Sequence, residues 1–174
     1  GNVWLDPAKT SPYKFYQFWL NVADEDAVRF IKIYSLKNRE EIDALISQHS
    51  GQEHLRLLQK ELAAEMTIRV HSENDLEMAL KATQISFGNG SAEDLKALDA
   101  STLAAAADGM ERFEVPKSAL IEGIAVLDLL AVQTQIFPSK SEARKMLQAN
   151  GFAFNKEKFT DAEGLVNTTL LLHG

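Results

Sequence analysis

Helix start signals recur through the first hundred residues of this chain, and they constrain its fold more than any other feature. Ser11 before Pro12 joins a preferred N-cap residue to a proline that suits the first helical position. Asn38 and Glu41 have the spacing of a capping box. Apolar residues between the signals recur every three or four positions, which is typical of helices. The pattern predicts helices over residues 13–20, 53–70 and 72–87. It also predicts one helix that starts after Asp24 as its N-cap, one that starts after Asn38, and two shorter helices that start near residues 91 and 99.

Two of these predicted helices have informative faces. The longest, over residues 53–70, carries one apolar stripe with a period near 3.6 residues, made of Leu55, Leu58, Leu62 and Met66. The helix over residues 13–20 is aromatic on nearly every side, so it is buried or docks onto another surface. Packing in a core is the favoured interpretation, and a platform on which bases stack is the alternative. Residues 1–108 are therefore predicted to be mostly α-helical.

The pattern changes after residue 107. Residues 110–115, bracketed by Asp108-Gly109 and Pro116, are predicted to be a linker or a short extended stretch. Two helices follow, one over residues 118–131 and one from a capping box at Ser139 to a stop at Asn150-Gly151. The second helix is expected to bury Ala143, Met146 and Leu147. Alternating and apolar runs then predict strands at 152–155, 158–159 and 165–172, with a turn at Lys156-Glu157. The predicted fold class is mainly α: an all-α domain followed by a small α+β domain.

The charge of the chain is unevenly distributed. Its net charge of −7 argues by itself against nucleic acid. Residues 1–108 carry 11 Lys and Arg against 17 Asp and Glu, whereas residues 138–160 carry five Lys and Arg against two Glu. A local basic footprint is enough to hold phosphates, because salt screens each charge beyond about 8 Å. The sequence therefore directs the search for a nucleic-acid site to residues 138–160.

Several classes of function are excluded or disfavoured by composition. The chain has no cysteine, which excludes disulfides, thiolate metal sites and a cysteine nucleophile. Its apolar runs fall short of the roughly 20 residues of a membrane span. The first residues lack the basic and apolar regions of a signal peptide, so we expect a cytoplasmic location and no membrane partner. His49 and His54 are five residues apart and do not share a helix face, so no metal site is expected. His71, between two predicted helices, is expected to be packed or to cap a helix.

The candidate RNA-binding residues lie on one predicted helix and on the strand and turn after it. Ser139 as N-cap leaves backbone N–H groups of the first turn free for a phosphate. Lys140 and Arg144 are four residues apart and share a helix face. The full set is Ser139, Lys140, Ser141, Arg144, Lys145, Asn155, Lys156 and Lys158. The alternative is a solvated basic face with no ligand. No residue is assigned a catalytic role.

Three blocks of sequence resemble one family. Residues 3–7 (Val-Trp-Leu-Asp-Pro) and 10–21 (Thr-Ser-Pro-Tyr-Lys-Phe-Tyr-Gln-Phe-Trp-Leu-Asn) resemble the segment of bacterial-type tyrosyl-tRNA synthetases just after their KMSKS-like loop. Residues 62–65 and 70–73 are similar to the helical anticodon-binding domain of that family. Residues 137–151 with Asn155-Lys156 resemble the small RNA-binding domain named after ribosomal protein S-four. The blocks occur in the order of the family and cover essentially the whole chain.

The resemblance implies a helical anticodon-binding domain over 1–112, of which 1–21 is the junction with a catalytic domain, and an S-four-like domain over 117–174 that is truncated at its C-terminal end. It implies that the chain is a C-terminal fragment without the catalytic centre, a metal or a cofactor of its own. The parent would be a homodimeric ligase, paired through its catalytic half, that attaches tyrosine to tRNA with ATP and magnesium. The fragment would be a monomer that binds the anticodon stem-loop and variable arm of the tRNA for tyrosine.

The resemblance also implies that Val3, Trp4, Leu5 and part of the aromatic helix pack on the catalytic half, and so lie exposed in this chain. Two alternatives stay open. The first is a free-standing RNA-binding protein with an S-four-like domain, against which the block over residues 3–21 counts. The second is a mitochondrial relative that assists splicing. Lys156 stands where many S-four-like domains have glycine, and a basic turn accommodates this difference.

Overall fold

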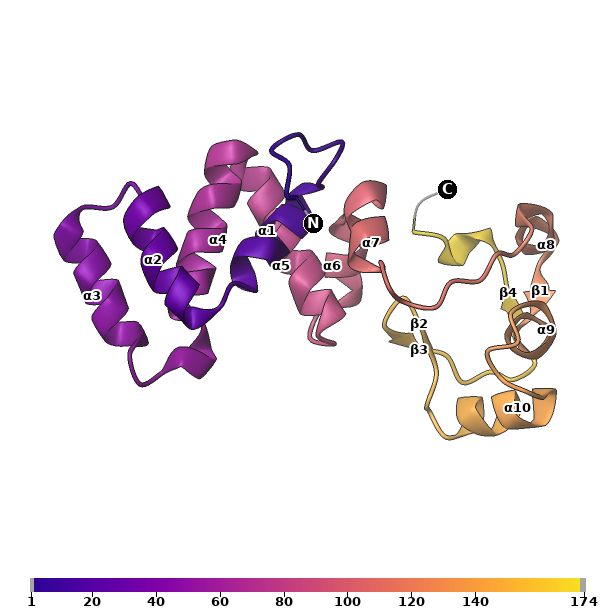
Figure 1. The fold of residues 1–174 in the computed structure, drawn as a ribbon. Coiled ribbons are helices and arrows are strands. Elements are labelled where there is room, and N and C mark those ends of the chain that lie inside the picture. Colours follow the sequence, from indigo (N-terminus) through magenta and orange to yellow (C-terminus); the bar gives the residue numbers. More distant parts are fainter. Residues whose placement is uncertain (1, 173–174) are drawn as a thin grey trace. The chain divides into compact units, whose positions relative to one another are not determined.

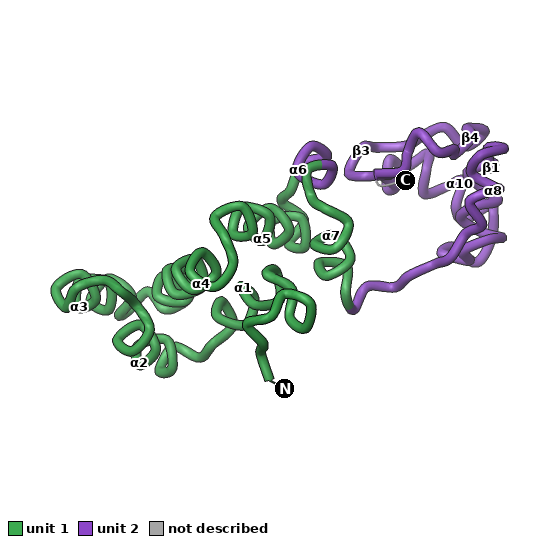
Figure 2. The backbone as a smooth tube through the Cα atoms, turned by 90° about the horizontal axis from the view of Figure 1, so that it is seen from above, with its two compact units in different colours: residues 1–90, 97–108 green, residues 91–96, 109–174 purple. Residues whose placement is uncertain are grey.

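The computed structural model of this chain describes residues 2–172. It divides into two compact units, which are described separately (Figure 2). Unit 1 comprises residues 1–90 and 97–108, and unit 2 comprises residues 91–96 and 109–174. Over the described residues the structure is mainly helical, and its strands form two sheets of two strands each. The predicted fold class is confirmed.

Unit 1 is a bundle of helices gathered around α4 (Figure 1). Its elements are α1 (Pro12–Leu20), α2 (Asp24–Tyr34), α3 (Arg39–His49), a 3-10 turn η1 (Glu53–Leu55), α4 (Leu57–Val70), α5 (Glu73–Ser86) and α7 (Ala100–Ala106). The short helix α6 (Ala92–Ala97) spans the boundary between the two residue ranges. Helix α4 packs against α1, α2, α3 and α5. This arrangement places the predicted apolar stripe of α4 in the middle of the bundle.

Most of the predicted helix starts are confirmed. The Ser11 hydroxyl accepts the Lys14 N–H at 3.3 Å, and Asn38 and Glu41 form both hydrogen bonds of a capping box. The prediction for Asp24 is wrong, because α2 begins at this residue and Ala23 is its N-cap. The Asp24 carboxylate instead accepts a 2.6 Å hydrogen bond from the side-chain amide of Gln59. The Asp24 carboxylate therefore binds the buried Gln59 amide of α4 and does not cap its own helix.

The predicted helix over residues 53–70 is broken at Arg56. This residue has a left-handed backbone with φ of 54°, so η1 ends there and α4 starts at Leu57. The Arg56 guanidinium donates hydrogen bonds to the carbonyl of Leu20 at 2.7 and 3.1 Å and to that of Val22 at 3.2 Å. These carbonyls lie at the C-terminal end of α1, where a helix has no intrahelical donors to offer. The break lets Arg56 supply those donors, and it leaves Leu55 exposed rather than in the stripe.

The aromatic helix α1 forms part of the core of unit 1, as the favoured interpretation predicts. Phe15, Tyr16 and Trp19 are buried. Burial raises the pKa of the Tyr16 hydroxyl. The ring of His71 packs edge-on against Phe15 with centroids 5.0 Å apart, and His71 is also the C-cap residue of α4, so its predicted role is confirmed. The core continues through buried residues of the neighbouring helices, namely Ala27, Ile31, Ile42, Leu58, Leu62, Ala63, Met66 and Ala79.

Part of the N-terminal segment remains outside this core. Trp4, Leu5 and Phe18 expose 48%, 66% and 42% of their surface, as predicted for a segment that packs on another part of a longer protein. Val3 is half-buried and packs against the core of unit 1. The predicted exposure is therefore confirmed for Trp4, Leu5 and Phe18 and wrong for Val3, which finds apolar neighbours within unit 1.

Unit 2 is a small α+β unit. Its elements after the linker are α8 (Lys117–Glu122), β1 (Ile124–Ala125), α9 (Val126–Asp128), a π-helical turn η2 (Leu129–Gln133), α10 (Lys140–Gln148), β2 (Ala153–Phe154), β3 (Glu157–Lys158), β4 (Leu165–Val166) and a 3-10 turn η3 (Thr168–Leu170). Strand β1 pairs with β4 in antiparallel register, with Ile124 opposite Val166. Strand β2 pairs with β3, with Ala153 opposite Lys158.

Three predictions for unit 2 are wrong in detail. The expected helix over 118–131 is interrupted at Gly123, whose φ of 84° suits glycine, and the chain then runs through β1. The expected strand over 165–172 is limited to β4 and gives way to η3. The tight turn of the hairpin falls at Asn155-Lys156 instead of Lys156-Glu157. The first difference accompanies the pairing of β1 with the distant β4, whereas the position of the turn follows from the local pairing of Phe154 with Glu157.

A second core holds unit 2 together. Its buried residues are Val126, Leu127, Leu129, Leu130, Ala143, Leu147 and Val166. A series of edge-to-face rings adds to it, with centroids 6.5 Å apart for Phe137 and Phe152 and 4.8 Å apart for Phe152 and Phe154. The predicted burial of Ala143 and Leu147 is confirmed, but Met146 is 39% exposed. Met146 therefore belongs to the surface of α10.

Candidate nucleic-acid interface

Helix α10 and its N-cap residue Ser139 account for five of the candidate residues, and the helix begins and ends where the sequence predicts. Of the predicted capping box, the bond to the Ser139 hydroxyl forms, whereas the return bond from the Ser139 N–H to the Glu142 carboxylate does not. The Ser139 hydroxyl accepts the Glu142 N–H at 3.2 Å. At the other end the N–H groups of Asn150 and Gly151 donate to the carbonyls of Leu147 and Met146, at 3.1 and 2.9 Å. This is a Schellman motif in which Asn150, with φ of 57°, takes the left-handed position. The helix thus has defined limits, from Lys140 to Gln148.

Two cations of α10 are paired with carboxylates of unit 2. Lys140 forms an ion pair with Asp128, and Arg144 Nη2 lies 2.8 Å from Glu163 Oε1. Their side chains are 53% and 48% exposed. Ion pairs this exposed contribute only about 0–1 kcal/mol, so a phosphate can displace the carboxylates at little cost. The two carboxylates orient the side chains of Lys140 and Arg144, and both cations stay accessible to a phosphate.

The remaining candidate residues of α10, Ser141 and Lys145, are exposed to solvent. Ser141 follows Lys140 in the first turn. Lys145 is exposed, and no acidic residue within the described part of the chain forms an ion pair with it. A cation without a carboxylate partner offers its full charge to a phosphate. Lys145 is in this respect the most available cation of the helix.

The other three candidates lie on the β2–β3 hairpin. Asn155 and Lys156 both have positive φ, at 49° and 69°, as in the type I′ turns that match the twist of a hairpin. The Asn155 side-chain amide donates a 2.6 Å hydrogen bond to the Leu170 carbonyl, which ties the turn to η3. Lys156 and Lys158 are exposed. Asn155 is thus a structural residue of the turn, and the two lysines carry the charge.

The candidates form two groups within unit 2. Ser139, Lys140, Ser141, Arg144 and Lys145 share α10, which is about 13 Å long at 1.5 Å per residue. The hairpin follows the C-terminal end of α10 (Figure 1). Lys145 belongs to the C-terminal half of the helix, whereas Ser139 is its N-cap. Sequence reasoning missed the carboxylates of Asp128 and Glu163. Glu163 is 19 residues from its partner, a separation that leaves no local signal.

Other kinds of site find little support in the described residues. None of the groups of His, Asp and Glu in the described part of the chain could hold a metal ion. Within residues 2–172 there is no helix long and apolar enough to cross a membrane. His49 is buried at the α2–α3–α4 contact, with its Nε2 atom 3.5 Å from Asp24 Oδ1.

Comparison with known proteins extends these observations. A family model described as tRNA synthetases class I (W and Y) matches residues 1–88. A tyrosine–tRNA ligase of Cytophaga hutchinsonii is 54% identical over 175 residues, which are 99% of this chain and 41% of that protein. A tyrosine–tRNA ligase of Bacteroides thetaiotaomicron is 49% identical over 174 residues, 100% of this chain and 40% of that protein. A tyrosine–tRNA ligase of Flavobacterium johnsoniae is 46% identical over 177 residues, which are 99% of this chain and 41% of that protein. The chain spans about 40% of the length of these curated relatives.

Proposed function

Because this chain belongs to the class I tRNA synthetases (W and Y), we propose that it is the C-terminal, tRNA-binding region of a tyrosine–tRNA ligase. The similarity to tyrosine–tRNA ligases over nearly all of the chain supports this proposal. The whole protein attaches tyrosine to its tRNA with ATP and magnesium, and it works in the cytoplasm as a homodimer paired through its catalytic half. The chain by itself is a monomer and does not activate tyrosine.

The proposal assigns a role to each part of the chain. Residues 1–112 are the helical anticodon-binding domain, with 1–21 at the junction to the catalytic domain. Residues 117–174 are the S-four-like domain. Together they hold the anticodon stem-loop and the variable arm of the tRNA. The relatives match this chain from residues in the first block through unit 2, which counts against a free-standing S-four-like protein.

One observation carries the assignment of the RNA surface. In a chain of net charge −7, exposed cations gather on α10 and on the hairpin after it. Contacts to phosphates supply most of the affinity in nucleic-acid binding and need only cations and free backbone donors. The proposed contacts are Ser139, Lys140, Ser141, Arg144, Lys145, Asn155, Lys156 and Lys158. The competing interpretation is a solvated basic face that binds no RNA.

A pair of double variants separates the two interpretations. Lys145→Ala with Lys158→Ala removes two cations of the interface for which the described residues supply no ion pair. Lys32→Ala with Lys60→Ala removes two equally exposed cations from α2 and α4 of unit 1. We expect the first pair to weaken binding of the tRNA for tyrosine by about tenfold or more. The slope of log K against log salt becomes shallower by about 0.7–0.9 for each lost phosphate contact.

The control carries the same loss of charge at two positions outside the proposed set of contacts, so it tests whether a general loss of positive charge accounts for the weaker binding. Equal losses of affinity in the two double variants would mean that the basic residues of unit 2 form a solvated face. Circular dichroism of each variant checks that the helices persist, as expected for exposed lysines replaced by a good helix former.

A further inference from the structure

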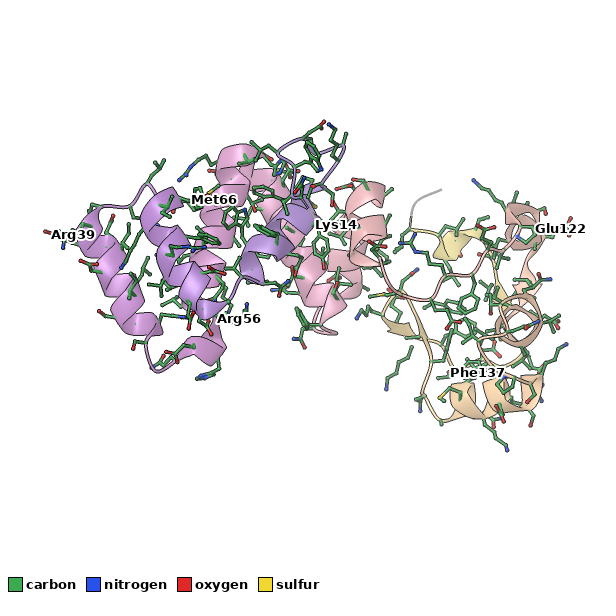
Figure 3. All side chains as sticks on the ribbon, viewed as in Figure 1. Lys14, Arg39, Arg56, Met66, Glu122 and Phe137 are labelled. Carbon is green, nitrogen blue, oxygen red and sulfur yellow. The ribbon has the colours of Figure 1, made fainter. Side chains whose placement is uncertain are left out.

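A wide-open surface cavity of about 370 Å³ lies beside α10, and Lys145 is the one candidate residue that lines it. It is lined by Phe137, Glu142, Lys145, Met146 and Ala149. Its volume falls at the lower end of the range of small-ligand pockets, about 300–1,000 Å³. Phe137, Met146 and Ala149 make its walls largely apolar, and the two charged side chains are exposed. Figure 3 labels Phe137 where it lies beside α10.

The two larger apolar walls are held in place by the rest of unit 2. The Phe137 N–H donates to the Leu130 carbonyl at 3.1 Å, and its ring meets Phe152 edge-on. Met146 lies against Gly151, where an added Cβ would stand 2.2 Å from the Met146 sulfur. Only glycine at position 151 lets the thioether occupy this place. The Phe137 wall is therefore formed before any ligand arrives, which lowers the cost of binding, and the flexible Met146 side chain can adjust to the ligand.

Two charged side chains line the cavity, and they act on a phosphate in opposite ways: Lys145 attracts it and Glu142 repels it. Lys145 has no ion pair within the described residues, whereas Lys140 and Arg144 are held by Asp128 and Glu163. Glu142, three residues before Lys145 on α10, also lines the cavity, and its carboxylate repels phosphate. A ligand that fits has one flat apolar part, which enters the cavity, and one anionic group, which stays at Lys145. A nucleotide with its base unstacked has this form.

We propose that this cavity receives one unstacked nucleotide of the bound RNA, with the base between Phe137 and Met146 and its phosphate at Lys145. The inference rests on the proposed function, and it specifies in addition that the RNA is unpaired where it contacts the cavity. Bases inside a duplex are stacked on each other and cannot enter, so the contacted nucleotide belongs to a loop, a bulge or a single strand. Stacking of a base on an apolar or aromatic wall is tolerant of sequence, so the site reads strand structure more than base identity.

NMR signals of the methionine methyl groups test the insertion of a base directly, without any substitution in the chain. It has four methionines, and Met66 and Met78 are at least half-buried in unit 1 while Met110 is exposed elsewhere. The chain is labelled with ¹³C at the methionine methyls and titrated with a twelve-nucleotide oligoadenylate or with an abasic oligomer of the same backbone. The ring current of an inserted base shifts the Met146 methyl signal with oligoadenylate only. Oligoadenylate also binds roughly tenfold more tightly than the abasic oligomer, as expected for one stacked base.

A matched pair of variants links this difference to the cavity. Met146→Glu places a carboxylate inside it, and Gln148→Glu adds the same charge to the last turn of α10 outside it. We expect Met146→Glu to bring the two oligomers to nearly equal affinity. Gln148→Glu weakens both and preserves their ratio. The methyl spectrum of the unchanged chain gives an answer even if Met146→Glu does not fold.

The outcomes separate this inference from the function on which it rests. A Met146 methyl that shifts equally with both oligomers, or with neither, overturns the inference, as does a preference for oligoadenylate that survives Met146→Glu. In those cases salt-dependent binding of the tRNA for tyrosine would still support the proposed function. If the unchanged chain does not bind that tRNA, the proposed function itself is wrong.

Discussion

Asp99 caps a helix with a carboxylate whose environment alters its own chemistry. Its carboxylate caps α7 by accepting the Thr102 N–H at 2.9 Å and the Thr102 hydroxyl at 2.7 Å, and the Ser101 hydroxyl also donates to it. Partial burial by itself raises the pKa of this carboxyl. The hydrogen bonds to its charged form outweigh that effect and lower the pKa from 3.8 to about 2. Because the folded pKa lies below the unfolded one, the stabilisation is present above pH 3.8 and is lost as the pH falls towards 2.

We expect Asp99→Ala to lower the free energy of unfolding by about 1 kcal/mol near neutral pH, a value reduced for the exposure of the carboxylate. The deficit shrinks as the pH falls below 3.8, where the unchanged chain also begins to lose the contribution. Urea unfolding at neutral pH and at about pH 3 measures both values. Asp99→Asn serves as control, because asparagine caps a helix without titrating in this range. A deficit that stays constant across this range would show that the charge of Asp99 has no part in the cap.

At the scale of elements, the β2–β3 hairpin combines a strained turn with a proposed contact to RNA. Lysine at position 156 has φ of 69°, a left-handed conformation that costs an ordinary residue about 1–2 kcal/mol. Asn-Gly is the preferred pair for such turns, and Asn155 already occupies the first position. A lysine in the second position is thus unfavourable for folding and useful for holding phosphate.

Replacing this lysine should move stability and affinity in opposite directions. We expect Lys156→Gly to raise the free energy of unfolding by about 0.5–1 kcal/mol, because glycine relieves the strain. The same change weakens tRNA binding and makes its salt dependence shallower by up to about 0.9. Lys156→Asn removes the same charge with a smaller gain in stability, so it isolates the electrostatic part. Unchanged tRNA affinity in both variants would remove Lys156 from the proposed interface.

At the scale of the whole molecule, each unit has a core of its own. Leu62 belongs to the core of unit 1 and Leu147 to that of unit 2, and both are fully buried. Buried leucines cut to alanine lose about 2–5 kcal/mol through lost contacts and the cavity left behind. Cores that share no buried residue should respond separately.

Leu62→Ala and Leu147→Ala form a matched pair for this prediction. Hydrogen exchange read by mass spectrometry should show lost protection in α1, α2 and α4 for the first variant, and in α10 and β4 for the second. Each variant should leave the other unit protected as in the unchanged chain. Lost protection spread over both units by either variant would mean that the chain unfolds as one cooperative body.

The sequence by itself determined the features whose causes lie within one turn of a helix. The caps at Ser11, Asn38, Ser72 and Ser139 follow from hydrogen bonds to residues three positions on, and all four were predicted correctly. The mainly helical fold class followed from the same signals. The resemblance to tyrosyl-tRNA synthetases was also carried by local blocks of residues.

Only the tertiary structure decided the features whose partners are distant in the chain. Arg56 breaks a predicted helix because carbonyls 34 and 36 residues away lack donors. Residues 118–131 do not form one helix because Ile124 pairs with Val166. Met146 shares the apolar periodicity of Ala143 and Leu147 but is 39% exposed, and it lines a cavity beside Phe137 that the periodicity does not predict. Contacts of this kind depend on which surfaces meet in three dimensions, and the spacing of residues along the chain does not record that.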